Sequence, residues 1–234
     1  MKGLLAKIAA KLGIYEYCVK KINTYKERKE AAAVKKYGVE VLQLVNDILE
    51  PKGVHPFLYA GLLLGAYREK GFIPYDYDLD LGILASERPE NIVQIMQLHG
   101  FKVVRQFYFK ENQRITIDQF EYKGVPVDFY YFYEIDDHTI ASFVPKRHET
   151  KEWREANETD GFPCDMDATD KTTFSKKEFL GHLFYMPDNA EQFLKDLYGA
   201  DFMQPIKGWS QGERTTRRYP YPKRQYRNLA ITNV

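Results

Sequence analysis

Residues 71–83 read Gly-Phe-Ile-Pro-Tyr-Asp-Tyr-Asp-Leu-Asp-Leu-Gly-Ile, with acidic and apolar or aromatic residues alternating from position 75 to 81. In an extended strand every second side chain points to the same face. The pattern therefore predicts that Asp76, Asp78 and Asp80 share one face of a strand, with neighbours roughly 7 Å apart. Carboxylates so placed repel one another, and a divalent cation such as Mg²⁺ would be bound by their hard oxygen atoms. The alternative is a solvated edge strand whose charges oppose aggregation.

A glycine-flanked apolar run, Gly61-Leu62-Leu63-Leu64-Gly65, precedes the acidic stretch. A glycine that opens a helix lets a phosphate approach the backbone N–H groups, and the helix dipole favours the anion. Arg68 follows Gly61 by about two helical turns on the same side, where it would hold a phosphate oxygen. An ion pair between Arg68 and Glu69 would explain the presence of an arginine at this position equally well. We expect Gly61, Gly65 and Arg68 to bind substrate.

A further carboxylate, Asp128, lies in an otherwise hydrophobic strand. The apolar residues at odd positions from 125 to 133 form one face of that strand, so Asp128 points to the other. Burying an unpaired carboxylate costs several kcal/mol, so this position needs a cation or a hydrogen-bonding partner. Lys123-Gly124 predicts a hairpin turn to a strand at 115–122, where Asp118 is the rival ligand. We prefer Asp128 because its neighbours are more apolar.

These residues together resemble the signature of the LicD/fukutin-type phosphotransferases. The resemblance is carried by Gly61-x-Leu63-Leu64-Gly65-Ala66-x-Arg68 and by residues 71–80. A weaker match comes from residues 185–189 and from Leu197-Tyr198-Gly199. The acidic run looks closer to the fukutin-related branch than to the bacterial choline-phosphate enzymes. The chain departs from the usual pattern at Tyr75, where tryptophan is common.

The resemblance implies an α+β fold, a nucleotidyltransferase-like mixed sheet with helices mainly on one face. It also implies an enzyme that uses Mg²⁺, with Mn²⁺ as the alternative. This enzyme would move a phospho-alcohol from a CDP-linked donor to a hydroxyl of a glycan or glycolipid acceptor. The transferred group would be a polyol phosphate, such as ribitol or glycerol phosphate, or phosphocholine.

Role assignments combine this resemblance with the residue patterns. The predicted catalytic residues are Asp76, Asp78, Asp80 and Asp128, and the predicted metal ligands are Asp78, Asp80 and Asp128. The predicted substrate-binding residues are Gly61, Gly65, Arg68 and Asp118. Either Asp76 or Asp118 would accept the proton of the acceptor hydroxyl.

Composition limits the organisation of the chain. With 234 residues, 44% of them hydrophobic, it is long enough for one substantial core. The two cysteines, Cys18 and Cys164, are far apart and argue against a disulfide framework or a structural zinc site. No apolar run approaches the about 20 residues of a membrane span, and no signal-peptide pattern opens the chain. The expected compartment is the cytoplasm, or the inner face of a membrane.

Charge divides the chain into three parts. Residues 1–36 carry ten Lys/Arg against three Asp/Glu, and residues 207–227 carry seven against one. With a net charge of +1 overall, about −12 is left for residues 37–206. We therefore expect a basic helical segment at 1–36, a catalytic domain at 37–206 and a basic Tyr/Pro-rich tail at 207–234.

The two basic parts suggest partners. The N-terminal helix would lie on an anionic membrane surface, or dock on the core or on a second subunit, through Leu4, Leu5, Ile8, Leu12, Tyr15 and Val19. The tail interleaves cations with tyrosines, a composition that suits nucleic-acid binding. We favour docking of the tail on the acidic domain. Two other functions stay open: an Asp-x-Asp glycosyltransferase and, third, a nucleic-acid-binding module.

Periodicity and turn residues predict the scaffold. Helices are expected at about 36–50, 60–69 and 86–99 and after Pro187-Asp188. Extended segments are expected at 56–60, 75–83 and 101–110 and in a hairpin at 114–133. Residues 145–174 lack periodicity and are expected to form an acceptor-binding loop.

Overall fold

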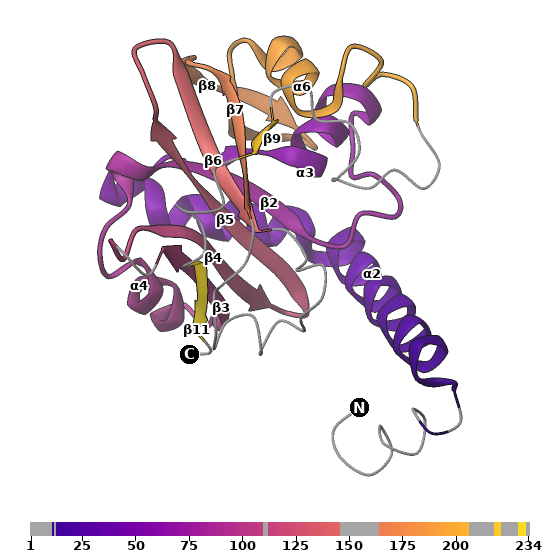
Figure 1. Cartoon of the computed structure of the whole chain (residues 1–234). Helices are drawn as coiled ribbons and strands as arrows, with labels where there is room; N and C mark the ends of the chain where they lie inside the picture. Colours follow the sequence, from indigo (N-terminus) through magenta and orange to yellow (C-terminus); the bar gives the residue numbers. More distant parts are fainter. Residues whose placement is uncertain are drawn as a thin grey trace.

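The computed structural model describes residues 11, 13–109, 112–145, 164–205, 218–220 and 229–232 (Figure 1). The helical elements are α2 (Tyr15–Leu49), η1 (Glu50–Lys52), α3 (Ala60–Leu64), η2 (Gly65–Glu69), η3 (Ala85–Glu87), α4 (Ile92–Leu98) and α6 (Ala190–Tyr198). The strands are β1 (Phe57–Leu58), β2 (Leu79–Leu84), β3 (Lys102–Phe109), β4 (Ile115–Tyr122), β5 (Val125–Glu134), β6 (Thr139–Pro145), β7 (Cys164–Asp170), β8 (Phe174–Phe179), β9 (His182–Pro187), β10 (Arg218–Pro220) and β11 (Leu229–Thr232).

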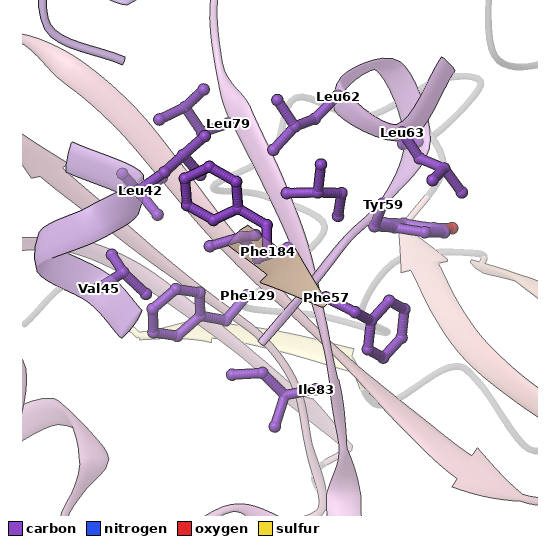
Figure 2. Close-up of a cluster of buried hydrophobic side chains, with 14 of the residues drawn as sticks. Leu42, Val45, Phe57, Tyr59, Leu62, Leu63, Leu79, Ile83, Phe129 and Phe184 are labelled. Carbon is purple, nitrogen blue, oxygen red and sulfur yellow. The ribbon is translucent and has the colours of Figure 1, made fainter. Parts of the chain in front are cut away.

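The strands form one mixed sheet in the order β10-β7-β6-β5-β2-β1-β9-β8, and β4, β3 and β11 continue from β5. β5 is the branch point. It runs parallel to β2 and antiparallel to β4, and its last two residues, Tyr133 and Glu134, pair with β6. This mixed sheet with its helices confirms the predicted α+β class. The helices, which were expected mainly on one face, lie on both faces, with α2 on one (Figure 2) and α6 on the other.

The central strands bury side chains on both faces. Val45 of α2 lies next to Phe129 of β5 (Figure 2), so α2 covers the face that carries the odd-numbered residues of β5. On the other face, the ring of Phe193 in α6 contacts Phe57 and Phe132, with centroids 6.2 and 5.9 Å away. Both faces of the sheet are thus covered, and polar groups between these layers need partners.

The acidic run is only partly a strand, which corrects the expected alternation. β2 begins at Leu79, and a turn precedes it, in which the N–H of Asp76 donates to the carbonyl of Ile73 at 3.0 Å. Asp76 and Asp78 therefore lie in irregular chain, and of the three only Asp80 lies in the sheet. The parallel pairing ends where Asp78 would meet Pro126, because proline has no N–H to donate to the ladder.

The remaining predictions of local structure are partly confirmed and partly wrong. The hairpin is confirmed: Lys123 and Gly124 have φ of 54° and 78°, as a two-residue turn of mirror-image type requires. The helix near 86–99 is shorter than expected, since Pro89 separates η3 from α4. The expected loop at 145–174 is wrong for Cys164–Asp170, which pair with β6 as β7, and residues 146–163 lie outside the described part.

Helix α2 is the longest element, and it runs without interruption across the expected domain boundary at residue 36. Its N-terminal half projects from the sheet (Figure 1), and Tyr17 and Tyr25 are 63% and 73% exposed there. Leu4, Leu5, Ile8 and Leu12 lie outside the described residues, so membrane contact stays a prediction. Among the described helices, none has both the length and the apolar character needed to cross a bilayer.

Two short pieces of the basic tail join the sheet. β10 pairs with β7, and β11 pairs with β3, both antiparallel. These contacts agree with docking of the tail on the domain. The Lys and Arg residues at 214, 217, 223, 224 and 227 lie outside the described residues.

Candidate functional site

Three carboxylates converge at the start of β2. Asp80 is the direct partner of Asp128 in the parallel pair of β2 and β5, so both side chains point to the same face of the sheet. Asp78 reaches the same point from the turn before β2. Oxygen atoms of Asp78, Asp80 and Asp128 all lie within 4.8 Å of one another. The structure therefore brings together the three residues that were predicted to ligate a metal.

Burial makes this cluster electrostatically unfavourable. Burial, and then the charge of the neighbouring carboxylates, raises the pKa of Asp78 and of Asp80 well above the usual range. Burial likewise raises the pKa of Asp128 to about 6, although a hydrogen bond from Gln119 opposes the shift. A bound cation would reverse this balance by favouring the charged forms.

The donor set fits a hard divalent cation. All three groups are carboxylates, which prefer Mg²⁺ and Mn²⁺ over softer metals. Three protein ligands also leave coordination positions for substrate oxygens, as Mg²⁺ usually requires at phosphate sites. The side chains present at this point can therefore hold the ion that the sequence predicts.

Asp76 and Gly61 lie together at the edge of the cluster. A Cβ on Gly61 would stand 2.4 Å from Oδ2 of Asp76, so the missing side chain leaves room for this carboxylate. Burial raises the pKa of Asp76 to about 6, against a hydrogen bond from the backbone N–H of Tyr77. At the position where a substrate phosphate was expected to approach Gly61, the structure places the carboxylate of Asp76.

Gly65 and Arg68 are held in internal packing. A Cβ on Gly65 would stand 2.6 Å from the carbonyl oxygen of Gly71, so the glycine allows close packing of η2 on the following chain. Arg68 forms an ion pair with Glu69 at 2.7 Å and donates to the carbonyl of Phe202 at 3.0 Å. The structure thus shows the ion-pair alternative for Arg68, and neither residue belongs to the carboxylate cluster.

Asp118 lies on the opposite face of the sheet from the cluster. It is the antiparallel partner of Phe129, and its carboxylate accepts hydrogen bonds from Arg88 at 2.9 Å and from the hydroxyl of Tyr131 at 2.6 Å. Its side chain is 1% exposed. Both bonds go to Oδ2, and the buried Oδ1 has no hydrogen-bond partner among the described residues. The ion pair with Arg88 balances the buried charge without a substrate, and the strand face separates Asp118 from Asp128.

Two polar neighbours of the cluster were not predicted. Gln119 donates from Nε2 to Oδ2 of Asp128 at 2.5 Å, and the side chain of Tyr130 hydrogen-bonds to Asp80. Counting pairs outward from the Lys123-Gly124 turn would have placed Gln119 opposite Asp128. The position of Tyr130, two residues after Asp128 on the same strand face, is the corresponding signal.

Comparison with known proteins identifies the family of this chain. The model of the family described as LicD/FKTN/FKRP, nucleotidyltransferase domain, matches residues 53–187, which is more than half of the chain. The chain belongs to this family. The matched segment of this LicD-family chain contains β1 to β9 and all three carboxylates of the cluster.

Individual relatives cover parts of the LicD-family chain. The ribitol-5-phosphate transferase FKTN of Mus musculus is 28% identical over 180 residues, which are 77% of this chain and 36% of that protein. The Homo sapiens protein of the same name is 28% identical over 183 residues. The ribitol 5-phosphate transferase FKRP of Mus musculus is 35% identical over 128 residues, 45% of this chain and 26% of that protein. The chain spans about a third of the length of the FKTN relatives that it matches.

Proposed function

We propose that the protein is a Mg²⁺-dependent phosphotransferase that moves a polyol phosphate from a CDP-linked donor to a hydroxyl of a glycan. The observation that carries the proposal is the convergence of Asp78, Asp80 and Asp128, with oxygens within 4.8 Å, in a chain of the LicD family. Phosphoryl transfer depends on such positioning and charge neutralisation. Ribitol phosphate is our preferred group because FKTN and FKRP carry it in their names.

Each carboxylate has a role in this proposal. Asp78, Asp80 and Asp128 would hold the ion, and Gln119 and Tyr130 fix the orientation of two of them. When bound, Mg²⁺ supplies positive charge that stabilises the diphosphate of the donor and the departing CMP. Asp128 is buried and Asp78 and Asp80 are partly buried, which strengthens these interactions relative to bulk water.

Asp76 is our candidate for the proton acceptor. It lies beside the cluster against Gly61, whereas Asp118 is bonded to Arg88 on the other face. The hydroxyl of the acceptor would give its proton to Asp76 while its oxygen bonds to the phosphorus. The bond between that phosphorus and the oxygen of CMP breaks, and CMP leaves with the electron pair.

The proposal is tested by donor binding and turnover. CDP-ribitol, CDP-glycerol and CDP-choline are compared by thermal stabilisation with and without Mg²⁺, and the release of CMP is measured for each. UDP-sugars and GDP-sugars are tested in parallel, because a glycosyltransferase would bind these nucleotide sugars instead. We expect Mg²⁺-dependent stabilisation by a CDP-alcohol. Stabilisation by a nucleotide sugar and by no CDP-alcohol would contradict the proposal.

Matched variants connect the activity to the cluster. Asp78→Asn and Asp80→Asn should lower Mg²⁺-dependent release of CMP by at least about a hundredfold, because removing one stabilising charge costs about 3 kcal/mol at such sites. Asp47→Asn removes an exposed carboxylate of α2 and should leave release unchanged. Full activity in both cluster variants would disprove the metal-site assignment.

A further inference from the structure

A row of polar residues crosses four strands on the face that carries the cluster. Arg105 of β3 is the partner of Gln119 of β4, Gln119 is the partner of Asp128, and Asp128 is the partner of Asp80. Direct partners in neighbouring strands point to the same face. The row therefore begins at a guanidinium group and ends at the paired carboxylates.

A bulge in β3 turns Arg105 toward this face. Val103 pairs with Phe120, yet Arg105 pairs with Gln119, so Val104 is an extra residue in the ladder. With regular alternation Arg105 would share the face of Val103, which is 7% exposed and belongs to the hydrophobic core. The bulge thus places a charged side chain on the face that carries the cluster, where its guanidinium carbon lies 5.8 Å from the ring centroid of Phe107. Bulges often re-aim side chains in this way beside active sites.

Arg105 has unused hydrogen-bonding capacity. Its Nε atom is buried and has no hydrogen-bond partner within the described part of the chain, although the residue as a whole is half-buried. Its positive charge acts on Asp128 and lowers the pKa of that carboxyl, against the larger effect of burial. A buried unpaired donor costs about 1–3 kcal/mol, which a bound acceptor would recover. The planar fork of arginine suits a phosphate in particular.

We propose that Arg105 binds a phosphate oxygen of the donor diphosphate, and this inference rests on the proposed function. The Cα atoms of Arg105 and Asp128 are two strand spacings apart, about 10 Å. An arginine side chain is long enough to reach past Gln119 toward a diphosphate whose other phosphate lies on an ion at the carboxylates. Arg105 would then fix the phosphate that faces away from the ion and would take no part in bond breaking.

The test compares cytidine, CMP and CDP, all with Mg²⁺, by isothermal titration calorimetry. In Arg105→Gln we expect about ten- to a hundredfold weaker binding of CDP, as for a lost hydrogen bond to a charged group. Binding of cytidine should not change, because the nucleoside has no phosphate. Arg105→Lys keeps the charge but loses the planar fork, so its CDP affinity should be intermediate.

Arg114→Gln is the matched control, since it removes an exposed arginine that stacks over Tyr133, 4.6 Å from the ring centroid. It should bind CDP as the unmodified protein does.

Equal CDP affinity in Arg105→Gln would overturn the inference and leave the proposed function standing. Equal losses for cytidine and CDP would also overturn it, because the defect would then be structural. If the unmodified protein bound no CDP, the proposed function itself would fail. Should Arg105→Gln not fold, Arg105→Lys gives the same comparison.

Discussion

Asp80 and Asp128 are direct partners in the parallel pair of β2 and β5, inside a layer whose other paired residues are mainly apolar or aromatic. Two carboxylates in register repel each other, and burial increases this repulsion. The fold therefore keeps an arrangement that is unfavourable without a cation. Such an arrangement indicates a ligand site, because hydrophobic residues at the same two positions would pack without this electrostatic repulsion.

The first prediction concerns metal binding and stability. Asp80→Asn removes one charge from the cluster, so in EDTA its melting temperature should equal or exceed that of the unmodified protein. Mg²⁺ at a hundred times its Kd should stabilise the unmodified protein by about 2.7 kcal/mol and this variant hardly at all. Differential scanning calorimetry measures both effects. A variant that is still stabilised by Mg²⁺ would contradict the role of Asp80 as a ligand.

The second prediction concerns pH. The folded-state pKa of Asp128 is raised to about 6, whereas an unfolded aspartate titrates near about 4. Between these values the folded state binds more protons, so without metal the free energy of unfolding should fall as pH rises from about 4 to about 6. Mg²⁺ competes with the proton for the Asp128 carboxylate, so the affinity of the protein for Mg²⁺ should rise over the same pH interval.

Other carboxyl groups also titrate in this interval, so the second prediction is measured as a difference. Asp128→Asn should be more stable than the unmodified protein above pH 6 in EDTA, and the gap should close toward pH 4. Urea unfolding at several pH values gives this comparison. A gap that does not depend on pH would show that Asp128 keeps an ordinary pKa.

The third prediction separates Asp118 from the metal site. Asp118→Ala leaves Arg88 buried without its carboxylate, and breaking such a pair costs about 3–5 kcal/mol. The free energy of unfolding should fall by that amount, while Mg²⁺ binding by the folded variant stays unchanged. Equilibrium unfolding and Mn²⁺ titration measure the two quantities. Normal stability combined with lost metal binding would instead support Asp118 as a metal ligand.

The fourth prediction contrasts two glycines. In Gly61→Ala the new Cβ meets the end of the Asp76 side chain, which can rotate, so the protein should fold and release CMP more slowly. In Gly65→Ala the Cβ meets the backbone carbonyl of Gly71, which cannot rotate away. That variant should lose about 1–3 kcal/mol of stability. Unchanged CMP release in Gly61→Ala would argue against Asp76 as the proton acceptor.

Local patterns predicted much of this molecule. The hairpin turn, the helix ending at Leu49 before Pro51 and the helix ending at Tyr198 before Gly199 depend on a few neighbouring residues, and each is present. Asp128 was singled out for a similar reason, because a charge inside an apolar strand is visible without knowing the fold. For Arg68 the sequence left the ion pair with Glu69 and a phosphate contact as alternatives. Asp118 was placed less well, since its partner Arg88 lies 30 residues away and could not be assigned from spacing.

Residue order was sufficient to indicate the α+β class, the LicD-type motif and the identity of the three carboxylates, because these depend on residue type and short spacing. Folding determined which strand lies beside which, and therefore that Asp80 faces Asp128 while Asp118 faces the other side. It also determined the turn before β2 and the bulge that reorients Arg105. Register between distant strands follows from packing of the whole core, and shifting it by one residue reverses every side chain.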